Sequence, residues 1–66
     1  MDQATEIVLR AIIINLAKLD GGREFARGLS QNLFLAIEEL IGDPVTQKEV
    51  GKFADLARHL RDQNQS

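Results

Sequence analysis

The sequence predicts a small all-α domain of three helices. Its 66 residues contain two clusters of helix-breaking residues, Gly21-Gly22 and Gly42-Asp43-Pro44, which divide the chain into three segments. Within each segment apolar residues recur every three or four positions, which is the period of an amphipathic helix. No repeat or linker interrupts the pattern, so residues 1–66 are expected to form a single domain.

The first helix is expected over about 4–19, ending before Gly21, where glycine can adopt the left-handed conformation that closes a helix. Its broad main face is expected to pack inside the domain and comprises Val8, Leu9, Ile12, Ile13, Leu16 and Leu19. A second stripe lies nearly opposite, at spacings of four, three and four, and comprises Ile7, Ala11, Ile14 and Lys18. This is the spacing of a coiled-coil seam and predicts a helix-mediated homodimer. The alternative is ordinary exposed apolar surface, which is common on soluble proteins.

The second helix is expected over about 23–41, and the short loop before it predicts an N-terminal antiparallel helical hairpin. Its main apolar face comprises Phe25, Ala26, Leu29, Leu33, Ala36, Ile37 and Leu40. Phe34 and Ile41 widen this face, and Leu35 lies apart on the other side. One neighbouring helix cannot cover so wide a surface, so Phe34, Leu35 and Ile41 are predicted to bind a protein partner.

The third helix is expected over about 47–61. Thr46 is the predicted N-cap, with Glu49 as its capping-box partner and Val45 and Val50 as a hydrophobic staple. The face turned to the core comprises Val50, Phe53, Ala54, Leu56, Ala57 and Leu60. Residues 62–66 contain no apolar side chain and are expected to fray.

Chain length makes this domain marginally stable. A chain of this size buries only about 60% of the surface that its unfolded form exposes. The sequence has no cysteine for disulfides, and with His59 as its one histidine it offers too few ligands for a structural zinc ion. Association with another chain is the remaining source of stability, which favours the homodimer.

Net charge and hydropathy limit the expected binding partners and the expected location of the chain. The net charge is −2 and the pI about 5.2, so the chain lacks the positive field that drives non-specific nucleic-acid binding. The longest apolar stretch is interrupted by polar residues and is too short to cross a membrane, and the N-terminus does not resemble a signal peptide. The lack of cysteine favours the cytoplasm, and a short chain of this kind suggests a bacterial or phage source.

Residues for catalysis are few. The sequence contains no tyrosine, tryptophan or cysteine, and Glu38 and Glu39 point in directions about 100° apart on one helix, so they form no shared site. His59 lies on a polar helix face, and Gly21-Gly22 is neither preceded by a strand nor followed by the residues of a phosphate loop. The chain is therefore expected not to be an enzyme, and to have no metal site and no cofactor.

Two functions remain. The first is a small protein-binding module that modulates a partner protein as an accessory or inhibitory regulator. The alternative is a small DNA-binding transcriptional regulator that uses the basic residues of the third helix: Lys48, Lys52, Arg58, His59 and Arg61. Residues 46–54 resemble the first helix of a helix-turn-helix motif, but residues 56–60 continue the same helical period where the motif needs a turn. The segment from Val45 onward has a net charge of only +1, so protein binding is favoured.

Overall fold

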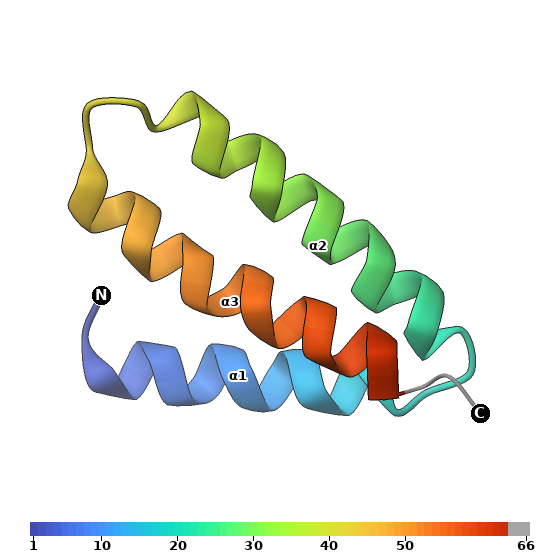
Figure 1. Ribbon diagram of the computed structural model, residues 1–66. Helices are drawn as coiled ribbons and strands as arrows, with labels where there is room; N and C mark the ends of the chain where they lie inside the picture. Colours follow the sequence, from blue (N-terminus) through green and yellow to red (C-terminus); the bar gives the residue numbers. More distant parts are fainter. Residues whose placement is uncertain (64–66) are drawn as a thin grey trace.

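The protein consists of three helices in a flat arrangement (Figure 1). The computed structural model describes residues 1–63, with α1 at Gln3–Ala17, α2 at Gly22–Glu39 and α3 at Pro44–Gln63. The Cα atoms span 38 × 25 × 13 Å. The predicted all-α, three-helix fold is confirmed, and α2 runs back obliquely across the molecule, at a wide angle to α1. The closest pair, however, is α2 with α3, whereas α1 touches both much less extensively.

Small residues form the contact between α2 and α3. Ala26 and Ser30, spaced by four along α2, are buried, as are Ala54 and Ala57 on α3. Small side chains on facing ridges allow two helices to approach closely. The largest buried side chain is Phe53, and among the described residues no large side chain is completely buried. The domain therefore has a thin core of mostly alanine.

Each link between helices contains a glycine in the left-handed conformation, as the sequence predicts. Gly21 has φ +79° and Gly42 has φ +98°. Both α1 and α2 end about two residues earlier than expected. At the first link the Gly22 N–H donates to the Leu19 carbonyl at 2.8 Å, and a Cβ added to Gly22 would collide with the Ala17 carbonyl. The end of α1 thus lies directly against the start of α2.

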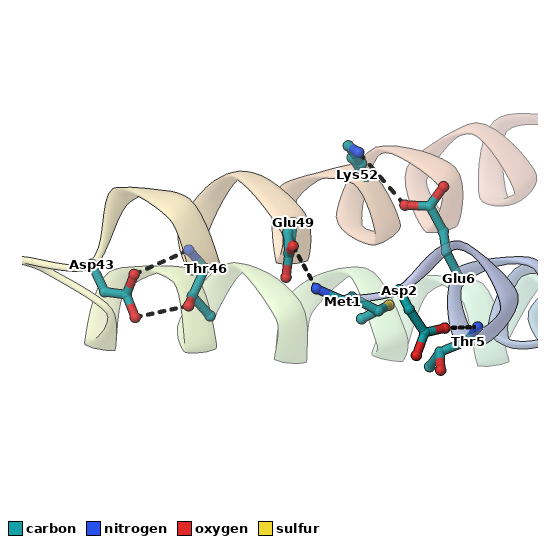
Figure 2. A network of polar contacts seen from close by, with 8 residues as sticks. All are labelled: Met1, Asp2, Thr5, Glu6, Asp43, Thr46, Glu49 and Lys52. Atoms are coloured by element: carbon teal, nitrogen blue, oxygen red, sulfur yellow. Dashed lines mark hydrogen bonds and ion pairs between the residues drawn. The ribbon is translucent and has the colours of Figure 1, made fainter.

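The start of α3 differs from the predicted capping box. The helix begins at Pro44, and Asp43 is its cap: the Thr46 N–H donates to Asp43 Oδ1 at 3.1 Å, and the Thr46 hydroxyl donates to Asp43 Oδ2 at 2.7 Å (Figure 2). The prediction of Thr46 as N-cap with Glu49 as its partner was wrong. Proline has no N–H and a preset φ, which suits the first helical position, and aspartate before it is a strong cap.

The other end of α3 also extends beyond its predicted limit. The helix continues to Gln63, so the expected fraying is wrong for residues 62 and 63. Residues 64–66, for which fraying was also expected, lie outside the described residues.

Polar contacts attach the N-terminal half of α1 to α3. The Met1 ammonium group donates to Glu49 Oε1 at 2.7 Å, which raises the pKa of that amine, and Lys52 Nζ lies 3.5 Å from Glu6 Oε1 (Figure 2). Asp2 caps α1 by accepting the Thr5 N–H at 2.7 Å, and this hydrogen bond lowers the pKa of the Asp2 carboxyl. These groups are partly exposed, so the contacts orient α1 more than they stabilise it.

Replacing Gly22 with alanine should strongly destabilise the fold. The new methyl group would meet the backbone of Ala17, which cannot move aside without separating α1 from α2. We expect a loss of more than about 2 kcal/mol, or a fall in Tm of roughly 10 °C, measured by thermal unfolding.

The matched control is Gly28→Ala, also within α2. A Cβ at Gly28 meets nothing within 4 Å, so this change should raise stability by about 0.5–1 kcal/mol through helix propensity. Equal effects of the two substitutions on Tm would show that the close contact at Gly22 does not limit which residue the fold accepts there.

The Asp43 cap should make stability depend on pH. Hydrogen bonds from the Thr46 side chain and backbone hold the pKa of Asp43 below its ordinary value of 3.8. Because the pKa is lower in the folded state, the stabilisation is complete above about pH 5 and is lost as pH falls through 3.8 towards the folded pKa. Asp43→Asn keeps an acceptor for the Thr46 N–H but cannot titrate, so the fall in Tm between about pH 5 and 2.5 should be smaller than in the wild type.

A control for this experiment is Asp20→Asn. Asp20 precedes α2, whose start carries no side-chain cap. This variant removes the same unit of charge without removing a cap, so the difference between the two variants isolates the effect of the Asp43 hydrogen bonds. An unchanged profile in Asp43→Asn would contradict the assignment of the cap.

Candidate functional site

The most apolar face of α1 points away from the other two helices. It comprises four large aliphatic side chains of the helix and Leu19, just after its C-cap, each more than a third exposed, and we name it the outer face of α1: Val8, Leu9, Ile12, Leu16 and Leu19. Ile12, in the middle, is 50% exposed. The prediction that this face packs inside the domain was wrong for these five residues. Ile13, the sixth residue predicted there, is half-buried.

A narrower side of α1 packs inward instead. Ala17 is buried, and Glu6, Ile13 and Ile14 are half-buried. Ala17 faces inward because the link to α2 is short and brings Gly22 against the Ala17 backbone. Near the start of α1, the ion pair between Glu6 and Lys52 holds this inward side of the helix towards α3. These constraints, and not the hydrophobicity of the faces, orient the helix.

The predicted coiled-coil stripe lies on the flank of α1. Ile7 and Ala11 are exposed, as is Lys18, which is the C-cap residue, while Ile14 is half-buried. The four residues lie along one side of the helix, as their spacing requires. Their role in a dimer contact stays a prediction.

A second apolar surface lies at the end of α2. Phe34 and Leu35 are exposed on its last turns, and Ile41, in the link to α3, is 87% exposed. Phe34 and Leu35 point in directions about 100° apart on the helix, so they face different sides of it. We name these three residues the α2 end patch. Their binding to a partner stays a prediction.

The basic residues of α3 lie among acidic ones. Lys52 lies 3.5 Å from Glu6, Arg58 lies 3.4 Å from Asp55, and Arg61 lies 3.0 Å from Asp62. Lys48 and His59 are exposed. Nearby carboxylates reduce the attraction of these cations for phosphate. α3 is also one helix from Pro44 to Gln63, without the turn near Asp55 that a helix-turn-helix motif would require.

Titratable groups do not gather into a catalytic arrangement in the part of the chain described. Glu38, Glu39 and His59 are all exposed, and Ser30, the one buried polar residue there, lies on the side of α2 that packs against α3. Within residues 1–63, no three histidine, aspartate or glutamate side chains come together to hold a metal ion.

None of the helices in the described chain has the length and apolar character needed to cross a membrane. Comparison with family models, with curated proteins and with solved structures gives no match. The outer face of α1, the α2 end patch and the basic residues of α3 are therefore the surfaces from which a function can be inferred.

Proposed function

We propose that this protein is a small, non-catalytic protein-binding module that acts as a homodimer and modulates a partner protein. The observation that supports this is the distribution of its apolar side chains. The described core contains no large side chain that is fully buried, while eleven large hydrophobic residues are exposed. Exposed apolar surface that gathers into patches is typical of protein-interaction sites. A regulator of this kind needs no chemistry of its own, and the cytoplasm suits a chain without cysteine.

The α2 end patch is the proposed contact for the partner. Phe34 supplies an aromatic ring, and Leu35 and Ile41 supply aliphatic side chains that the folded domain leaves exposed. Side chains of this kind contribute most of the binding energy when they enter a partner's pocket, and surrounding polar residues exclude water. Glu38 and Glu39, exposed beside the patch, would form part of such a polar rim.

DNA binding through α3 is the competing function. It would use Lys48, Lys52, Arg58, His59 and Arg61, and its affinity would fall steeply with salt. Three of these residues already lie beside carboxylates, as described above. The chain as a whole also carries more acidic than basic residues, so the attraction to DNA would be weak.

The proposal predicts that a partner can be captured from the host, identified and then bound in purified form. Phe34→Ala or Leu35→Ala should weaken that binding by tenfold or more, because about 1.4 kcal/mol per anchor is a typical loss. The matched control is Val45→Ala, which shortens an exposed apolar side chain outside the patch and should leave the affinity unchanged. Titration calorimetry measures both values.

The same samples test the competing function. Duplex DNA should not bind at physiological salt. Binding that is detected there, and that Lys52→Glu combined with Arg58→Glu abolishes, would replace the protein-partner proposal with the DNA-binding one.

A further inference from the structure

We infer that the outer face of α1 is the contact between two copies of this chain, each packing its own α1 against the other. This inference rests on the dimeric part of the proposed function and identifies the residues of the contact. It differs from the flank of Ile7, Ala11, Ile14 and Lys18, which the sequence predicts.

The surface area of the chain is large enough to accommodate such a contact. A compact monomer of 7.3 kDa exposes roughly 4,200 Å² by the scaling of surface with mass. This chain exposes 4724 Å², which is roughly 500 Å² more than that scaling gives. A standard protein interface covers roughly 800 Å² on each partner. One interface of about that size would remove the excess.

The shape of the outer face allows it to pack on itself. Residues four apart form a row of Ala4, Val8, Ile12 and Leu16 along α1, with Thr5 and Leu9 beside it. Ala4, Thr5, Val8 and Leu9 line a shallow hollow at the N-terminal end of this row. Because the face supplies both a ridge and a groove, the ridge of a second copy fits the groove of the first, and the reverse. A two-fold symmetric contact requires this self-complementarity.

The chemistry of the face also suits a second copy. Its five residues are aliphatic. The polar residue beside them is Thr5, at the N-terminal end, and Asn15, to one side of the face, already donates its side-chain N–H to the Ala11 carbonyl at 2.8 Å. Charged residues such as Asp2 and Lys18 lie at the edges. Two copies can therefore meet without burying an unpaired charge. A partner with a charged or strongly polar surface would not match this face.

The central test compares two isoleucines of α1 that differ in the side they occupy. Ile12 is 50% exposed on the outer face, and Ile7 is 58% exposed on the flank. Sedimentation equilibrium at micromolar concentration should show a wild-type dimer. Ile12→Glu should weaken the dimer by about a hundredfold or more, because it buries a carboxylate at the contact, whereas Ile7→Glu should change the affinity by less than about threefold. A monomeric wild type, or dissociation by Ile7→Glu alone, would overturn the inference.

Two further measurements keep the test valid if Ile12→Glu fails to fold. The Tm of the wild type should rise as its concentration is increased from about 1 to 100 μM, because association stabilises the folded chain. The sequence contains no cysteine, so a single introduced thiol can report on the contact. Ile12→Cys lies near the two-fold axis and should form a disulfide-linked dimer, whereas Ile41→Cys should not. A constant Tm, or equal cross-linking of both variants, would contradict the proposed contact.

The two proposals fail in different ways. If the wild type is a monomer while Phe34→Ala still weakens binding of the partner, only the α1 contact is wrong. If Ile12→Glu dissociates the dimer while substitutions in the α2 end patch have no effect on the partner, the α1 contact stands and the proposed binding site is wrong.

Discussion

The close contact between Gly22 and the Ala17 carbonyl determines how α1 lies on the rest of the protein. The link between α1 and α2 is so short that the end of one helix must lie against the start of the other, and only glycine leaves room for the carbonyl. This contact turns Ala17 inward. Since the residues of a helix have fixed angular positions, turning Ala17 inward also turns the opposite side, with Val8, Ile12 and Leu19, towards solvent.

As a result, much of the apolar surface of the domain is not buried and does not contribute to its stability. Burying a leucine or isoleucine side chain contributes about 1.5–3 kcal/mol, and each methylene group about 0.8 kcal/mol. The closest helix pair, α2 with α3, buries Ala26, Ala54 and Ala57, which have little apolar surface to remove from water. The larger aliphatic side chains of α1 also stay partly hydrated. Covering the outer face of α1 would therefore add stabilisation that the packing within the chain does not supply.

The sequence predicts the number, type and approximate extent of the helices because these depend on local signals. Gly21 and Gly42 have the left-handed conformation that their positions require, and the amphipathic period identifies each helix. The start of α3 was misplaced because two caps competed within four residues. The Asp43-Pro44 pair satisfies the first turn earlier in the chain than Thr46 could, and Glu49 is then available to the Met1 ammonium group. Competition between two possible caps can be recognised from the sequence when the preference of proline for the first helical position is taken into account.

The orientation of α1 could not be predicted in this way. A helical wheel ranks faces by hydrophobicity and assigns the most apolar face to the core, a rule that assumes the core lies within one chain. Here the covalent link and the small residues Ala17 and Gly22 decide the orientation, and both depend on three-dimensional proximity. The α2 end patch was found from sequence because Phe34, Leu35 and Ile41 exceed what one neighbouring helix can cover, and they are indeed exposed.

The positions of the two apolar surfaces have a consequence for assembly. In Figure 1, α1 and the last turns of α2 lie on opposite sides of α3. A dimer formed through the outer face of α1 would therefore leave the α2 end patch uncovered in both copies. The two-fold axis would produce two identical binding sites on one assembly, and a partner that is itself dimeric could engage both. Binding at the second site would then be intramolecular, so two contacts of moderate strength could together hold the partner much more tightly than either alone. Dimerisation would in this way supply both the stability that the short chain lacks and the affinity that a patch of three apolar side chains cannot reach by itself.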